Sequence, residues 1–280
     1  MKKITRRSFL AAAGLTAAAL ALTACGGSSS STASSAASSA AASSEAASTS
    51  AAAGELTTVE AGKLTMATNA TFPPYEMTTD VGTIEGIDVD TAQAIAEKLG
   101  LELQIDDMDF DAALLSVQQG KADIVMAGVT VTDERKAVMD FSDSYATGIQ
   151  SIIVPEGSDI ASPDDLAGKK IGTQRGTTGY IYCSDDFGDE NVVAYDDGLT
   201  AVQALNNGQV DAVVIDNAPA KEFIAANPGL VILETSYAEE DYAIGLAKGS
   251  SLKDAINSAL EELKADGTLQ SIVDKYISAE

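Results

Sequence analysis

The chain has 280 residues, with 17 Lys and Arg against 42 Asp and Glu, so its formal net charge is −25 at pH 7. This acidity excludes nucleic acid and anionic lipid headgroups as partners of a folded domain, because both carry negative charge. The sequence also contains no histidine and no Gly-x-Ser-x-Gly motif. Most acid–base, hydrolase and zinc chemistry depends on such groups. We therefore expect no catalytic residue, no metal and no cofactor.

The N-terminus has the features of an export signal. A basic segment at residues 2–7 precedes an alanine-rich apolar stretch at 9–22, which is shorter than the roughly 20 residues of a membrane span. Residues 1–24 are therefore predicted to be a signal peptide. Residues 22–25, Leu-Thr-Ala-Cys, resemble a lipobox, in which the thiol of Cys25 is diacylated. Ordinary cleavage with Cys25 incidental is the alternative, and general secretion and twin-arginine export both remain open.

Residues 25–54 consist almost entirely of Ser, Ala, Gly and Thr. Such a segment has too little bulky apolar surface to offset the entropy of ordering it, so we expect a disordered tether. With Cys25 acylated, the tether would hold the following domain on the outer side of the cell membrane through its lipid anchor. Cys183 would then be the one remaining cysteine, which excludes an intramolecular disulfide.

The rest of the chain alternates short apolar runs with amphipathic stretches, a pattern typical of an α/β fold with mainly parallel sheets. In chain order the pattern predicts a strand at 64–67, a helix at 90–99 closed by Gly100, a strand at 101–105, a helix at 111–119 and a strand at 124–127. Near the C-terminus, residues 250–263 and 269–277 each carry apolar side chains on one stripe and are predicted to be helices.

One helix–turn–strand pattern occurs twice. Residues 111–125 align with residues 199–213, so that a glycine, an aspartate and a valine coincide at Gly120 and Gly208, Asp123 and Asp211, and Val125 and Val213. Coincidence between generic units is the alternative, but three matches at one offset favour a duplicated architecture.

The duplication predicts two lobes, residues 55–147 with 243–280 for lobe 1 and residues 148–242 for lobe 2. Ligands of open parallel sheets bind beyond the carboxyl ends of the strands. The alignment places Gly128 and Asp216 at equivalent strand ends, where two such ends facing one another make a cleft. The chain is predicted to cross between lobes near 145–149 and 240–244, and paired crossovers suit a protein that closes by a hinge motion.

Arg135 is the first candidate binding group. It follows the strand end at Gly128 and stands at a predicted helix start, beside Thr130. A planar guanidinium with hydroxyl and backbone N–H donors nearby suits a carboxylate. The alternative is a surface arginine paired with Glu134 or Asp143.

Other candidates lie at the end of predicted strands or in the loops after them. Residues 176–179, Gly-Thr-Thr-Gly, could approach an anion or form an ordinary N-cap turn; they lack the lysine of a phosphate-binding loop. Asp216 could bind an ammonium group or cap the helix that runs to Ala226, and one carboxylate can do both. Phe72 and Phe110 could wall a ligand or belong to the core.

Several segments resemble the polar amino acid-binding proteins of bacterial ABC importers. They are residues 68–76, Thr-Asn-Ala-Thr-Phe-Pro-Pro-Tyr-Glu; residues 86–90, Gly-Ile-Asp-Val-Asp; residues 110–115; residues 127–135, on through 141–143; and residues 176–178 with Asp216. The similarity extends from about residue 64 to residue 277, with the motifs in the family's order. It implies a two-lobed, periplasmic-binding-protein-like fold that acts as a monomer, binds a free amino acid and delivers it to a membrane permease.

The same resemblance implies roles for individual residues. Arg135 would clamp the ligand α-carboxylate, helped by Thr130, Gly128 and Thr178. Asp216 would take the α-ammonium, with Phe72 and Phe110 on either side of the ligand. The implied set of binding residues is Asn69, Phe72, Phe110, Ala127, Gly128, Thr130, Arg135, Gln174, Thr177, Thr178 and Asp216. Asn69 and Gln174 would lie near the ligand side chain. Since both are neutral amides, they favour a polar, uncharged side chain such as that of glutamine.

Two other functions fit this fold. Some relatives are cyclohexadienyl dehydratases, for which Glu76 would be the nearest acid, and a receptor-coupled amino acid sensor is the other alternative. A calcium loop starting at Asp107 is rejected, because its sixth position is Ala112 rather than glycine and its twelfth is Gln118 rather than glutamate.

Overall fold

The computed structural model describes residues 56–277, so the predicted signal peptide, Cys25 and the tether lie outside the described residues. The strands of this part are β1 (Lys63–Thr68), β2 (Thr71–Phe72), β3 (Glu76–Thr78), β4 (Ile84–Glu85), β5 (Glu102–Asp107), β6 (Ile124–Val125), β7 (Met139–Pro155), β8 (Ile171–Gln174), β9 (Val192–Tyr195), β10 (Ala212–Asp216), β11 (Leu230–Ile232) and β12 (Ala238–Ala247). The α-helices are α1 (Ile87–Leu99), α2 (Phe110–Gln118), α3 (Asp133–Val138), α4 (Thr178–Phe187), α5 (Gly198–Asn206), α6 (Asn217–Ala226), α7 (Lys253–Ala265) and α8 (Thr268–Tyr276). Among these residues, no helix is both long and apolar enough to cross a membrane.

One mixed sheet runs through the described residues in the order β5-β1-β6-β12-β7-β10-β8-β9, with β11 paired to β7. The strands β5, β1 and β6 are parallel to one another, and so are β10, β8 and β9. Between these two sets, β12 and β7 run antiparallel to each other and to their neighbours. The predicted α/β fold with mainly parallel strands is confirmed.

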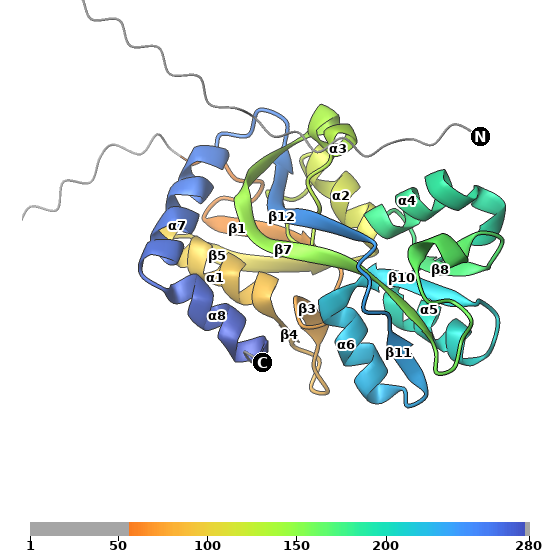
Figure 1. Ribbon diagram of the computed structural model, residues 1–280. Helices are drawn as coiled ribbons and strands as arrows, with labels where there is room; N and C mark the ends of the chain where they lie inside the picture. The colour runs from red at the N-terminus through yellow and green to blue at the C-terminus, as the bar shows by residue number, and fades with distance from the viewer. Residues whose placement is uncertain (1–55, 278–280) are drawn as a thin grey trace, which may run out of the picture. The chain divides into compact units, whose positions relative to one another are not determined.

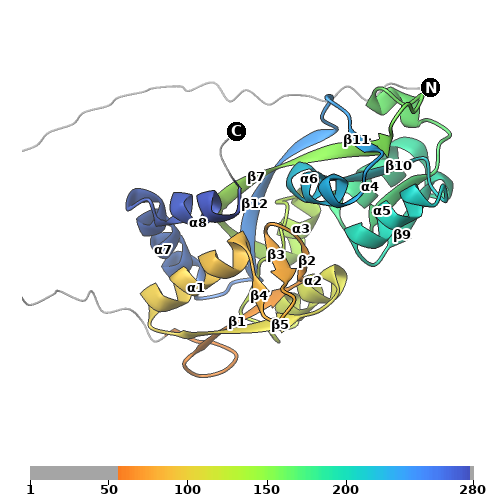
Figure 2. The ribbon, with the colours of Figure 1, turned by 90° about the horizontal axis from the view of Figure 1, so that it is seen from below.

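The apolar core is divided between two groups of elements, seen towards the two ends of the long strands β7 and β12 in Figures 1 and 2. Leu64, Ile124 and Ile256 are fully buried in the first group, and Val213 and Ile171 in the second. We call β1–β6 with α1–α3, α7 and α8 lobe 1, and β8–β11 with α4–α6 lobe 2. The residue boundaries predicted for the lobes stay a prediction.

The predicted crossovers at 145–149 and 240–244 lie inside β7 and β12. These two strands pair from Ala238↔Gln150 to Ala247↔Met139, with register shifts between Tyr242 and Ala243 and between Ala243 and Gly245. Such irregularities bend a strand and increase its local twist. The lobes are therefore joined by a bent two-stranded ribbon rather than by loops.

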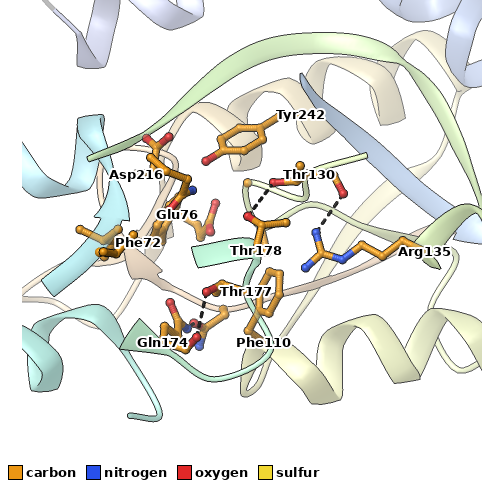
Figure 3. Close-up of a pocket in the computed structure, with 16 residues that line it drawn as sticks. Phe72, Glu76, Phe110, Thr130, Arg135, Gln174, Thr177, Thr178, Asp216 and Tyr242 are labelled. Carbon is orange, nitrogen blue, oxygen red and sulfur yellow. Dashed lines mark hydrogen bonds between the residues drawn. The ribbon is translucent and has the colours of Figure 1, made fainter. Parts of the chain in front are cut away.

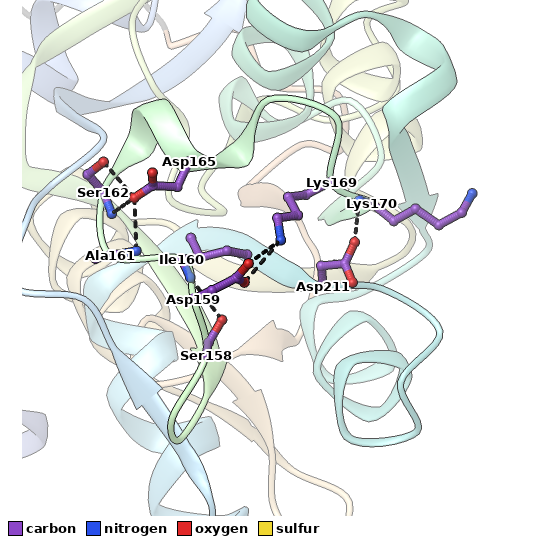
Figure 4. Close-up of polar contacts among 9 residues, drawn as sticks. All are labelled: Ser158, Asp159, Ile160, Ala161, Ser162, Asp165, Lys169, Lys170 and Asp211. Carbon is purple, nitrogen blue, oxygen red and sulfur yellow. Dashed lines mark hydrogen bonds and ion pairs between the residues drawn. The ribbon is translucent and has the colours of Figure 1, made fainter.

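The sequence repeat has a structural counterpart in the turn before β6 and β10. In lobe 1, a carboxylate oxygen of Asp123 accepts a 2.8 Å hydrogen bond from the backbone N–H of Thr65. In lobe 2, a carboxylate oxygen of Asp211 accepts a 2.8 Å bond from the N–H of Lys170, as Figure 4 shows. Each aspartate thus ties its turn to the start of the neighbouring parallel strand. Asp123 and Asp211, which the sequence alignment pairs, therefore have the same structural role in the two lobes.

Some element boundaries differ from the prediction. α1 begins at Ile87 rather than at residue 90, directly after Gly86, whose φ of 142° is open mainly to glycine. β6 ends at Val125, before the predicted residue 127. After β6 the backbone turns at Gly128, whose φ is 56°. The N–H of Gly128 donates to a carboxylate oxygen of Asp88 at 3.0 Å.

Candidate functional site

A cavity lies at the carboxyl ends of the parallel strands, between the lobes. All of the residues predicted for the site line it: Asn69, Phe72, Phe110, Ala127, Gly128, Thr130, Arg135, Gln174, Thr177, Thr178 and Asp216. Figure 3 shows most of them pointing toward a common space. The sequence did not single out Gln150, Val214, Ile215 and Tyr242 from the same wall, and it gave Glu76 no binding role.

Arg135 is held on the lobe 1 side of this cavity. The hydroxyl of Thr132 caps α3 by accepting from the backbone N–H of Arg135 at 3.2 Å. The guanidinium donates to the carbonyl oxygens of Thr130 at 2.9 Å and of Gly176, in lobe 2, at 3.1 Å. Burial lowers its pKa from the usual value. Because the side chain is only 9% exposed, the alternative of a surface arginine paired with Glu134 or Asp143 is wrong.

The loop at residues 176–179 forms the opposing wall in lobe 2. Thr177 caps α4, since its hydroxyl accepts from the backbone N–H of Tyr180 at 3.3 Å. The N-cap reading is therefore confirmed, and the cap also faces the cavity. The start of a helix favours negative charge. An anion beside Arg135 would thus also meet the favourable end of α4.

Asp216 is the buried acid of lobe 2. One oxygen caps α6 by accepting from the N–H of Ala218 at 3.1 Å, and the other accepts from the N–H of Ile149 at 2.7 Å. Burial raises the pKa of Asp216 to about 6, although these donors and the hydroxyl of Tyr242 lower it in part. A cation placed beside this carboxylate would relieve the cost of burying its charge. The predicted cap is confirmed and leaves the carboxylate on the cavity wall.

The two amides that were expected near the ligand side chain contact each other. Gln174 donates to the side-chain oxygen of Asn69 at 2.8 Å across the cleft, and also to the carbonyl of Asp196 at 3.2 Å. Asn69 in turn donates to the carbonyl of Met108 at 3.0 Å. Part of their hydrogen-bonding capacity is therefore used within the protein.

Glu76 is the most unusual group in the cavity wall. It is fully buried, and neither carboxylate oxygen has a hydrogen-bond donor among the described residues. It contacts Asp88, whose other oxygen accepts from Gly128 and, at 2.8 Å, from the hydroxyl of Tyr145. Two carboxyl groups can share a hydrogen bond only when one is protonated. Burial first, and then the charge of Asp88, raise the pKa of Glu76 well above its usual range.

These groups define a class of protein. A buried guanidinium in one lobe and a buried carboxylate in the other match the two charges of a free amino acid, and no group of at least three His, Cys, Asp or Glu residues that could hold a metal occurs in residues 56–277. The arrangement is that of a two-lobed amino acid-binding protein.

The chain belongs to the bacterial extracellular solute-binding proteins, family 3, whose family model matches residues 64–279. It is 33% identical over 226 residues to the L-cystine-binding protein TcyJ of Escherichia coli strain K12, covering 79% of this chain and 85% of that protein. Two similar solved structures are an ancestral arginine-binding protein bound to arginine and one bound to glutamine. They are 43% and 42% identical, each with a TM-score of 0.74, and each match covers 78% of this chain and 99% of the other. The resemblance found in the sequence is thus confirmed: the protein is an extracytoplasmic amino acid-binding protein of an ABC importer.

Replacing Arg135 should test the carboxylate clamp. In Arg135→Ala, a ligand carboxylate would be buried without its partner, which costs on the order of 2–5 kcal/mol. We expect amino acid affinity to fall at least about thirtyfold, and Arg135→Lys to recover only part of it, because an ammonium lacks the planar fork. Calorimetry measures the affinities. The control is Arg175→Ala, because Arg175 is exposed and lies 3.6 Å from Asp196, and this variant should bind the amino acid normally. Full affinity in Arg135→Ala would contradict the role.

Proposed function

We propose that this protein captures an amino acid with a cationic side chain, arginine foremost, for delivery to its permease. The observation that carries the proposal is Glu76, a fully buried carboxylate in the cavity wall without a donor among residues 56–277. A buried acid whose neighbour is another acid, Asp88, is costly to ionise, whereas one paired with a guanidinium gains charge-assisted hydrogen bonds. Asn69 and Gln174, which favour a neutral side chain, already bond to each other.

The arrangement of charges supports the same ligand. Arg135 suits the α-carboxylate and Asp216 the α-ammonium, which leaves Glu76 for a second positive charge at the side-chain end. Asp88 stands behind Glu76 and is itself buried, with a pKa raised to about 6, chiefly by burial. Two acids in contact favour a cation more strongly than one does. Similar proteins hold either arginine or glutamine, so both ligands belong in the test.

The substitution Glu76→Gln should change selectivity rather than abolish binding. Loss of the carboxylate should weaken arginine binding at least about thirtyfold, by the cost of leaving a buried charge unpaired. Glutamine affinity should stay the same or rise, since an amide can pair with an amide. Titration calorimetry of both amino acids measures this. Glu85→Gln is the matched control, because Glu85 lies on β4, which pairs with the strand of Glu76, β3, but outside the cavity. Equal effects on arginine and glutamine would count against a cationic ligand.

Arginine binding should release protons. The pKa of Glu76 is raised by burial and by the acidic groups Asp88 and Asp107 facing it. A guanidinium beside Glu76 favours its ionised form, so binding lowers this pKa and expels the proton. The affinity for arginine should therefore rise with pH through the raised pKa of Glu76 and then level off. The pKa of about 6 for Asp216 adds a similar rise near pH 6 for any α-amino acid.

The measurement is calorimetry near neutral pH in buffers with different ionisation enthalpies, whose slope gives the protons released. Arginine should release more than glutamine, and Glu76→Gln should remove the difference. If arginine binds without releasing more protons than glutamine does, Glu76 does not meet the ligand cation.

We also propose that the protein is a monomer anchored to the outer side of the cell membrane by lipid on Cys25, with no catalytic activity. The lipobox-like residues 22–25 and the Ser/Ala-rich segment after them support the anchor. Cys25→Ser should then shift the protein from the membrane fraction to the soluble fraction, because the thiol that carries the lipid is missing. Detergent phase partitioning of cells that express each form measures this, and unchanged membrane association would rule out the anchor.

A further inference from the structure

Glu240 is a buried acid on the ribbon that joins the lobes, and the binding roles above do not use it. It belongs to the run Glu239-Glu240-Asp241 in β12, whose outer two members are exposed, whereas Glu240 is only 7% exposed. It is not among the cavity-lining side chains; it stands behind Thr130 and Thr178, which are.

One oxygen of Glu240 receives hydrogen bonds from three directions. The hydroxyl of Thr130, in lobe 1, donates to it at 3.0 Å, and the hydroxyl of Thr178, in lobe 2, at 2.9 Å. The side-chain amide of Gln150, on β7, donates at 3.1 Å. A single carboxylate thus joins both lobes and the ribbon.

These bonds fix the direction of both threonine hydroxyls. A hydroxyl has a single proton, and each threonine gives its proton to Glu240. The two hydroxyls also contact each other at 3.4 Å, where either could be the donor. When both donate to Glu240 at the shorter distances, their oxygens remain as acceptors only. Acceptors suit an ammonium group, which can only donate, and they cannot donate to a carboxylate.

The charge of Glu240 acts on both charged ends of the cavity. It contributes to raising the pKa of Asp216, and it opposes the burial that lowers the pKa of Arg135. Figure 3 shows Thr130 and Thr178 on the wall between Asp216 and Arg135. The oriented hydroxyls therefore belong to the same cavity wall as Asp216 and Arg135.

We propose that Glu240 is a positioning residue for the α-ammonium: by taking the hydroxyl protons of Thr130 and Thr178, it turns one acceptor from each lobe toward that group. The α-carboxylate is left to Arg135 and to backbone N–H groups. Because the threonines belong to different lobes, both acceptors are assembled only when the lobes meet. The proposal rests on amino acid capture but is independent of which side chain the ligand carries.

The test compares an amino acid with the same acid lacking its amino group. The probes are arginine and 5-guanidinopentanoate, measured by calorimetry and by displacement of arginine. In Glu240→Ala the hydroxyls lose their common acceptor, so arginine affinity should fall about tenfold or more, the effect of one hydrogen bond to a charged group. Affinity for 5-guanidinopentanoate should change much less. Glu240→Gln should keep most of the discrimination, because an amide oxygen can accept from both hydroxyls.

Glu239→Ala, the exposed neighbour, is the matched control and should bind both probes normally. Thermal unfolding confirms that each variant is folded. An equal loss for both probes in Glu240→Ala would show that Glu240 only ties the lobes together, and no loss would remove it from the site; either result overturns the proposal. If the wild type binds glutamine but not arginine, the cationic ligand is wrong, and glutamine with its des-amino acid tests Glu240 in the same way.

Discussion

A charge taken out of water needs a partner, and in this protein that requirement is concentrated in one cleft. Arg135, Asp216, Glu76 and Glu240 are all nearly or fully buried around it. The guanidinium is satisfied by carbonyl oxygens of both lobes, and Asp216 by backbone N–H groups at a helix start. Neither carboxylate oxygen of Glu76 has a hydrogen-bond donor in the part of the chain described. The cleft is thus a set of partly compensated charges, and a zwitterionic ligand with a second cation would complete them.

The fold supplies hydrogen-bond donors for several buried charges in one place. Parallel strands end at the same edge of a sheet, where helix N-termini and loop N–H groups are available to buried acids. Asp216 and the loop at 176–179 both use a helix start in this way. The same helix–turn–strand motif occurs in both lobes, and Asp123 and Asp211 make equivalent hydrogen bonds in it. Duplication therefore supplies two edges of this kind, and the ribbon of β7 and β12 brings them face to face.

Site residues that belong to a short local motif could be predicted from the sequence. Arg135 and Asp216 stand next to strand ends and helix starts, so short motifs locate them. Glu240 could not be assigned, because it lies on a strand whose inward face is set by pairing with distant residues. Glu76 pairs only with nearby residues, but nothing in its local sequence shows that its side chain enters the cavity. In the run Glu239-Glu240-Asp241, the alternation of side chains along a strand shows that Glu240 points to the opposite face from its two neighbours. It does not show which of the two faces is buried. That choice depends on the pairing with β7, about 90 residues earlier in the chain for Gln150 and Glu240. The segments predicted as crossovers lie within β7 and β12, but the sequence did not indicate that these two strands pair with each other.

The ribbon has a mechanical consequence. A pair of loops would let the lobes slide, twist and separate independently, whereas two strands held by a continuous hydrogen-bond ladder resist all but bending and twisting at their irregular points, around Tyr242 and Gly245. The ribbon therefore restricts the relative motions open to the two lobes. A permease that contacts one point on each lobe could distinguish the ligand-bound from the ligand-free protein by the distance between these points. It would not need to contact the amino acid.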